Sequence, residues 1–149
     1  MDQSPIDPPL DPDVTPAEVA EPPHWPVVLA VALGGVAGAL ARYGAQRAWP
    51  TSGHDFPWTI LAVNLLGCAL IGVLMVLVTE RGPVSRLWRP LLGTGVLGGF
   101  TTFSTYSVDL QREFADGRAG QAIGYGAGTL IGAVLAVAVA TAAMRRVVR

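Results

Sequence analysis

Four long apolar segments constrain this chain more than any other feature of its sequence. They cover about residues 27–48, 58–79, 88–114 and 119–144, and each supplies the roughly 20 residues that a helix needs to cross a bilayer. The chain is 51% hydrophobic and only 14% charged. Because a segment in hydrocarbon must satisfy its backbone hydrogen bonds internally, the pattern predicts an all-α integral membrane protein with four transmembrane helices.

The tryptophans support these boundaries. Trp25, Trp49, Trp58 and Trp88 all lie at segment ends, and indole rings prefer the headgroup level of a bilayer. The connections between segments are short, which predicts antiparallel neighbours. We therefore expect residues 27–149 to form a single transmembrane domain.

Residues 1–26 differ sharply from the rest of the chain. They contain six acidic residues, no lysine or arginine, and eight of the twelve prolines. Such a segment cannot bury enough apolar surface to fold, so we expect a disordered, acidic, proline-rich tail. A signal peptide needs a basic start, so the first apolar segment is expected to be retained as a membrane helix.

The arginines say little about orientation. All ten cations are arginines, and four crossings would put six on the side of the termini and four on the other. This is a weak bias under the positive-inside rule. Insertion in both orientations is therefore compatible with the sequence, beside a fixed orientation with cytoplasmic termini.

Residues 93–107 place four glycines and seven hydroxyl side chains inside the third segment. Threonine and serine often bond to carbonyls of their own helix, but this number exceeds what that role requires. Backbone that leaves the helical pattern in a bilayer persists only when it is buried in protein or lines a watery path. We predict that the third membrane helix is broken here.

Few other polar side chains lie within the segments. Asn64 belongs to the second segment, and Tyr125 and Thr129 share one face of the fourth. Arg42, near the end of the first, either extends to the headgroups or lines the vestibule of an anion path. Glycines four residues apart mark faces for close helix packing, and they are Gly34, Gly38, Gly124, Gly128 and Gly132. Such faces in a chain with little interior of its own favour an oligomer.

Missing residue types exclude several functions. No Asp, Glu, Lys or His lies deep in a segment, which argues against a proton relay or a metal site. His24 and His54 lie outside the segments without a nucleophile at motif spacing, which argues against an enzyme. A small proton-coupled exporter of the multidrug type remains an alternative, although Glu80 and Asp109 lie only near segment ends. The single cysteine, Cys68, is interpreted as a packing residue.

Three motifs closely resemble the Fluc (CrcB) fluoride channels. They are GGVAGALARY at residues 34–43, NLLGC at residues 64–68 and GGFTTFST at residues 98–105, and the resemblance covers about residues 27–144 in order. It implies a small four-helix protein of the bacterial plasma membrane, assembled as an antiparallel dual-topology dimer with two fluoride pores and a structural sodium ion at its centre. The implied partners are fluoride, the lipid bilayer and a second copy of the chain, with no nucleic acid.

The resemblance also implies roles for individual residues. Asn64 matches the pore asparagine, and Phe103 matches the first of two phenylalanines whose ring edges face fluoride. Tyr125 and Thr129 match pore-lining positions of the fourth helix. Tyr106 departs from the family, because the second pore phenylalanine is usual at its position. Either the tyrosine is tolerated, or this chain is one half of a heterodimer whose other pore conducts.

Fluoride chemistry agrees with these roles. A pore must replace the tightly held water of fluoride with hydrogen-bond donors, to which Ser104 adds a hydroxyl, whereas a fixed buried cation would hold the anion too strongly. Aromatic ring edges are weakly positive. By the resemblance, backbone carbonyls of Gly98 and Thr101 bind sodium, and hard oxygens suit a small alkali cation. We expect a passive, fluoride-selective channel that exports cytoplasmic fluoride and confers fluoride resistance. The alternatives are the exporter and a non-conducting subunit of a heterodimer.

Overall fold

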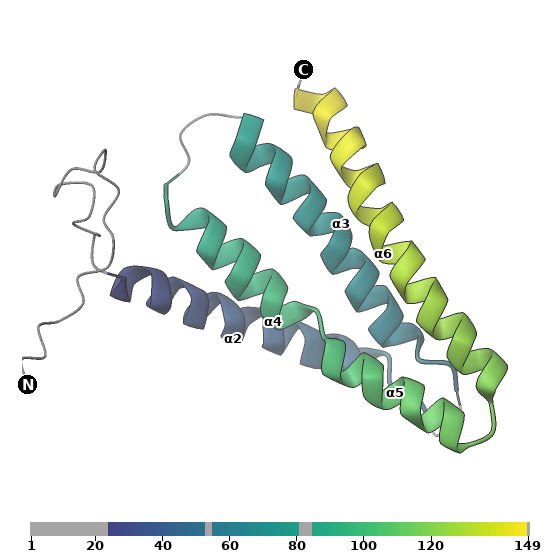
Figure 1. The fold of residues 1–149 in the computed structure, drawn as a ribbon. Helices are drawn as coiled ribbons and strands as arrows, with labels where there is room; N and C mark the ends of the chain where they lie inside the picture. The colour runs from purple at the N-terminus through teal and green to yellow at the C-terminus, as the bar shows by residue number, and fades with distance from the viewer. Residues whose placement is uncertain (1–23, 53–54, 81–84, 149) are drawn as a thin grey trace, which may run out of the picture.

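The computed structural model describes residues 24–52, 55–80 and 85–148, and these ranges contain helices and no strands (Figure 1). In chain order the helices are α2 (Trp25–Ala48), α3 (Trp58–Glu80), the π-helix η1 (Arg89–Leu97), α4 (Gly98–Phe100), α5 (Phe103–Ala115) and α6 (Ala119–Val148). α2 begins at Trp25 with Pro26 in its first turn, where the N–H that proline lacks has no helical partner to lose. The predicted tail lies outside the described residues as far as residue 23.

Three of these helices are long and apolar enough to cross a membrane, namely α2, α3 and α6. The rest of the chain leaves most of their surface uncovered. In α6, only 6% of the most apolar window is buried inside the protein. Apolar faces of this extent suit hydrocarbon and not water. The expectation of a helical, multi-pass membrane protein is therefore confirmed.

The helices pack in two main groups. α3 and α6 run side by side, while α2 packs against η1 and α4 (Figure 1). The third apolar segment is divided among η1, α4 and α5, and α5 leads through a short turn into α6. π-helices are rare and are often found at functional sites.

Glycines bring the backbones of α2 and the η1–α4 segment into contact. A Cβ atom on Gly34 would collide with the carbonyl oxygen of Leu91, and one on Gly38 with that of Val96. A Cβ on Gly95 would lie 3.0 Å from the Cα of Gly34. The expected close packing of Gly34 and Gly38 is confirmed, and it sets the position of the chain that follows η1.

Only part of the glycine face of α6 packs within the chain. A Cβ on Gly132 would lie 2.8 Å from a methyl carbon of Leu65 on α3. Gly124 and Gly128, by contrast, have no described atom within 4 Å of such a Cβ. The packing expected of Gly132 is confirmed, whereas Gly124 and Gly128 face outward from the described part of the chain.

Charged side chains join the helices at their ends. Arg118 Nε lies 3.2 Å from a carboxylate oxygen of the buried Glu113, beside the turn at Gly117 (φ 74°) that links α5 to α6. At the opposite end of α6, Arg145 donates to a carboxylate oxygen of Glu80 at 2.8 Å. These ion pairs link the turn before α6 to α5, and the last turns of α6 to the end of α3.

Candidate functional site

The helical path is interrupted at two threonines. α4 ends at Phe100, Thr101 is extended (φ −77°, ψ 159°), Thr102 is also extended (φ −148°, ψ 126°), and α5 begins at Phe103. Extended backbone cannot continue the regular hydrogen bonds of a helix. The groups that lose their helical partners must therefore find others.

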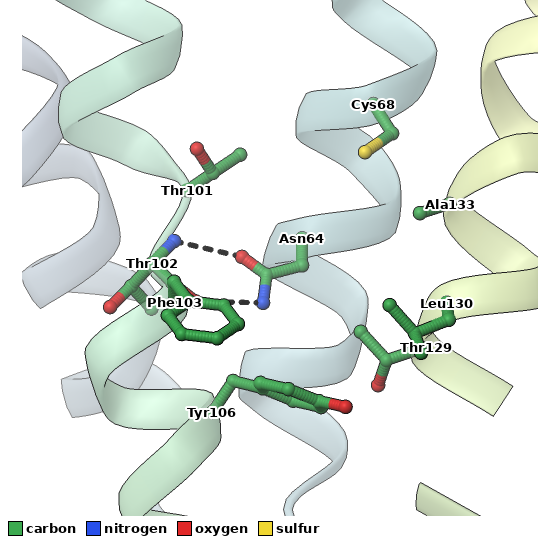
Figure 2. A pocket seen from close by; sticks show the side chains of 9 residues that line it. All are labelled: Asn64, Cys68, Thr101, Thr102, Phe103, Tyr106, Thr129, Leu130 and Ala133. Atoms are coloured by element: carbon green, nitrogen blue, oxygen red, sulfur yellow. Dashed lines mark hydrogen bonds between the residues drawn. The ribbon is translucent and has the colours of Figure 1, made fainter. Parts of the chain in front are cut away.

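Asn64 on α3 replaces one of those partners and adds a second hydrogen bond to the same residue (Figure 2). The N–H of Thr102 donates to Asn64 Oδ1 at 2.9 Å, and Asn64 Nδ2 donates to the carbonyl oxygen of Thr102 at 3.0 Å. In a continuous helix the N–H of Thr102 would bond to the carbonyl of Gly98. Asn64 thus stabilises the interrupted backbone, and its oxygen accepts from the N–H that would otherwise bond to the carbonyl of Gly98.

Thr102 caps the start of α5. Its Oγ1 accepts a hydrogen bond from the N–H of Thr105 at 3.2 Å and lies 3.2 Å from the hydroxyl of Ser104. In a continuous helix the N–H of Thr105 would bond to the carbonyl of Thr101. The carbonyls of Gly98 and Thr101 have therefore both lost their usual donors to side chains.

Thr101 anchors the end of α4. Its hydroxyl donates to the carbonyl of Leu97 at 2.9 Å, and its methyl group lies against Gly67 of α3, where an added Cβ would collide with it. A cavity of about 180 Å³ is lined by Gly67, Gly98 and Thr101 among others. The two carbonyl-bearing residues thus lie along one cavity between α3 and the break.

Arg42 contacts the break from the side of α2. Its Nε donates to the carbonyl oxygen of Gly99 at 3.2 Å, and the side chain is partly buried. The sequence suggested that this side chain either extends to the headgroups or lines a vestibule. In the structure it is bonded to the last turn of α4.

A second cavity, of about 250 Å³, opens beside the start of α5 (Figure 2). It is lined by Asn64, Cys68, Thr101, Thr102, Phe103, Tyr106, Thr129, Leu130 and Ala133. None of these nine side chains is ionisable in the usual range except the thiol and the phenol. The wall of the cavity is therefore largely apolar, with a few amide and hydroxyl groups and without a fixed charge.

Four residues that the sequence singled out for a pore lie along this cavity, which are Asn64, Phe103, Tyr106 and Thr129. The ring of Phe103 is 78% exposed, so its edge is open to a ligand. Ser104 and Tyr125 do not line the cavity. Ser104 is exposed beside Thr102, and Tyr125 is fully buried.

Tyr106, which lines the cavity, belongs to an aromatic cluster with Tyr125. Their ring centroids are 5.2 Å apart, and the ring of Phe56 meets Tyr125 edge-on at 5.5 Å. The Tyr106 hydroxyl donates to the carbonyl of Gly126 at 3.3 Å, and the Thr129 hydroxyl donates to that of Tyr125 at 2.7 Å. The Tyr125 hydroxyl has no hydrogen-bond partner among the described residues.

Two cavity residues were missed or assigned a lesser role. The sequence predicts a break among the hydroxyls of residues 93–107 but gives Thr102 no role of its own, although threonine is a preferred residue just before a helix start. Cys68 was interpreted as a packing residue. Its position four residues after Asn64 puts both on one helix face, which could have indicated the shared cavity.

The break creates two opposite electrostatic ends. The N–H groups of the first turn of α5 give the helix start a positive partial charge, and the carbonyls at the end of α4 give a negative one. An anion is favoured near the first and a hard cation near the second. Among the described residues, no group of His, Cys, Asp and Glu could hold a metal ion.

These features define a multi-pass helical membrane protein with an uncharged cavity at a helix break. The chain matches the family described as CrcB-like protein, Camphor Resistance (CrcB), over residues 29–141, and it belongs to that family. Three relatives illustrate the similarity. A protein of Streptomyces coelicolor named fluoride-specific ion channel FluC 1 is 56% identical over 124 residues, which cover 83% of this chain and 80% of that protein. Fluoride-specific ion channel FluC 2 of Nocardia farcinica is 48% identical over 83% of this chain and 89% of its own length. Fluoride-specific ion channel FluC of Saccharophagus degradans is 42% identical over 75% of this chain and 84% of its own length.

Proposed function

We propose that this protein is a fluoride-specific ion channel of a bacterial plasma membrane that lets cytoplasmic fluoride leave passively. The observation that carries the proposal is the uncharged cavity at the start of α5, where Asn64, Phe103 and Thr102 meet. The names of the relatives support the choice of ion. It is a transport function and not an enzymatic one.

The cavity suits a small, strongly hydrated anion. One amide N–H of Asn64 donates to the carbonyl of Thr102, which leaves the second N–H for a ligand. The first turn of α5 adds backbone N–H groups, and the exposed Phe103 ring adds a weakly positive edge. Because no fixed cation lines the cavity, an anion that enters can also leave.

The remaining pore positions follow the family resemblance. We assign Tyr106 and Thr129 to the wall of the cavity. By the family resemblance, we assign Ser104 and Tyr125 to the path beyond it. The unpartnered hydroxyl of Tyr125 supports its assignment, because a buried hydroxyl without a partner is costly unless a ligand or water reaches it.

No energy source is needed for export. A membrane potential of about 100 mV, negative inside, is worth roughly 2.3 kcal/mol per charge, which favours an external anion by a factor of about 50. Hydrogen fluoride enters from acidic surroundings as a neutral acid and ionises inside. A passive anion path therefore lowers cytoplasmic fluoride, which would confer resistance.

We propose that η1, α4 and α5 together form the third of four membrane crossings and that two chains assemble antiparallel. A single chain leaves the cavity beside Gly98 and Thr101 open and leaves Gly124 and Gly128 unpacked. A broken membrane helix is stable only when its backbone is buried in protein or lines a watery path. A second copy in inverted orientation would cover these surfaces, and the weak arginine bias permits both orientations.

The carbonyls of Gly98 and Thr101 fit a structural sodium ion. Both have lost their helical donors to side chains, and both residues line the same cavity. Carbonyl oxygens at the negative end of a helix are suitable ligands for a hard cation. Sodium there would supply the charge that balances these carbonyls, with Asn64 and Thr102 holding the backbone in place.

A proton-coupled exporter is less well supported. It requires a titrating carboxylate in the path, and neither Asp109 nor Glu80 lines the cavity at the break. Asp109 lies 3.8 Å from Arg112, and Glu80 is bonded to Arg145.

Purified protein in liposomes tests the function. With equal sodium inside and outside, vesicles loaded with potassium fluoride and given valinomycin should release fluoride to an external electrode, while the same vesicles loaded with potassium chloride should release almost no chloride. Fluoride release that requires an opposing proton gradient would favour the exporter. No release from this chain alone, with release restored by a second homologue, would favour the heterodimer.

A further inference from the structure

The hydrogen bond between Arg42 and Gly99 stands out, because it pairs a charged side chain of one helix with a backbone carbonyl of another beside a break. In a continuous helix the carbonyl of Gly99 would accept from the N–H of Phe103. The extended residues Thr101 and Thr102 interrupt that path, and Arg42 Nε donates at 3.2 Å instead. A carbonyl left bare in hydrocarbon would be unfavourable.

The register of α2 brings Arg42 to this carbonyl. Gly34, Gly38 and Arg42 are four residues apart and therefore share one helix face. Gly34 and Gly38 touch the backbone of η1 and α4, so Arg42 lies one turn farther, where the helix facing α2 ends. A cation is also favoured at the carboxyl end of a helix.

We propose that Arg42 is a positioning residue of the break: its guanidinium replaces the helical donor of Gly99 and so determines where α4 ends. Asn64 does the same for Thr102 from α3, so the break is held from two helices. The carbonyl of Gly99 is therefore already hydrogen-bonded to Arg42, whereas the carbonyls of Gly98 and Thr101 remain available to bind a cation. The inference rests on the proposed function only for its effect on fluoride flux.

A spectroscopic test addresses the bond directly. Gly99-Phe100 is the only Gly-Phe pair in the chain, so protein labelled with ¹³C-carbonyl glycine and ¹⁵N-phenylalanine gives a single carbonyl-to-amide correlation. Arg42→Met keeps the side chain as far as the position of Nε but places no donor there, and Arg42→Gln places a neutral N–H donor at that position. Arg47→Met, on an exposed residue of the same helix, is the matched control.

We expect the Gly99 carbonyl resonance to move upfield in Arg42→Met and to stay near its original position in Arg42→Gln and Arg47→Met. Fluoride flux should fall by at least about tenfold in Arg42→Met and recover in part in Arg42→Gln. An unmoved resonance in Arg42→Met would overturn the proposal. So would a loss of flux in Arg42→Gln as deep as in Arg42→Met with its resonance retained, because the charge and not the bond would then matter.

The two proposals fail in different ways. If wild-type protein releases no fluoride while the resonance responds as expected, the channel function is wrong and the position of Arg42 stands. If Arg42→Met does not accumulate in membranes, the resonance and flux of Arg42→Gln decide. Retention of both in Arg42→Gln supports the proposal, and a shifted resonance with normal flux overturns it.

Discussion

At the scale of single residues, Asn64 combines two tasks in one amide. Its oxygen replaces the helical partner of the Thr102 N–H, one of its N–H groups adds a bond to the Thr102 carbonyl, and its second N–H remains for a ligand in the cavity. Phe103 needs no such support, because its ring is largely exposed beside the cavity. Tyr106 is the reverse case, a buried ring whose hydroxyl is already bonded to Gly126. Substitutions at these two aromatic residues should therefore have different effects.

Replacing Phe103 with isoleucine should abolish fluoride release while the protein still folds. The aliphatic side chain fills similar space but lacks the positive ring edge. Since the side chain is exposed, the free energy of unfolding should change by less than about 0.5 kcal/mol. Liposome flux and thermal unfolding in detergent measure the two effects, with Phe114→Ile, an exposed residue of α5 away from the cavity, as control. Normal flux in Phe103→Ile would remove this residue from the pore.

Replacing Tyr106 with phenylalanine should retain or raise fluoride flux, because the ring edge remains. The lost hydrogen bond to Gly126 is long, at 3.3 Å, so its removal should cost about 1 kcal/mol of folding stability or less. The same two assays apply. A large loss of flux with unchanged stability would mean that the hydroxyl itself contributes to fluoride conduction. No fluoride release by the wild-type chain alone would favour the heterodimer.

At the scale of the elements, the position of the break depends on how α2 and α3 pack against the η1–α4 segment. α2 does so through backbone contact at its glycines, and α3 through Asn64 and through Gly67, which accommodates the methyl group of Thr101. Close helix contact in a bilayer gains from dispersion and not from exclusion of water. The contact is consequently intolerant of added volume.

Gly38→Ala should destabilise the protein by about 1–3 kcal/mol, because the new methyl group would collide with the carbonyl of Val96. Gly44→Ala on the same helix is the matched control. It meets no described atom within 4 Å and should be neutral or slightly stabilising, since alanine favours helices. Thermal unfolding in detergent compares the two, and equal melting temperatures would contradict the packing described for α2.

At the scale of the whole molecule, a single chain leaves much apolar surface and two cavities open. Lipid can cover the apolar faces, but it cannot satisfy the carbonyls at a break. In the proposed inverted dimer, the second chain would cover the cavities, and the sodium ion would bind the carbonyls at the break. Sodium would then serve as a part of the structure and would not drive transport.

Fluoride flux should accordingly depend on the presence of sodium and not on its gradient. Protein purified and reconstituted without sodium should conduct poorly, and equal sodium on both sides should restore conduction fully, because bound ligand stabilises the state that binds it. Equal lithium or potassium on both sides is the control. Flux that follows the direction of a sodium gradient would indicate coupled transport instead.

The sequence by itself determined the membrane location and the helical class, because about 20 apolar residues in a row have few alternatives to a membrane helix. It also indicated close packing at Gly34 and Gly38, since small residues four apart share one face. Only the tertiary structure decided which polar groups meet. Arg42 and Gly99 are 57 residues apart, and Asn64 and Thr102 are 38 apart, so no local spacing predicts their bonds. Local spacing likewise does not predict that Ser104 and Tyr125 lie outside the cavity lining, because this depends on how α5 and α6 are rotated about their axes. The chemistry of a side chain follows from its residue type, but its partner is determined by the packing of helices that are distant in the sequence.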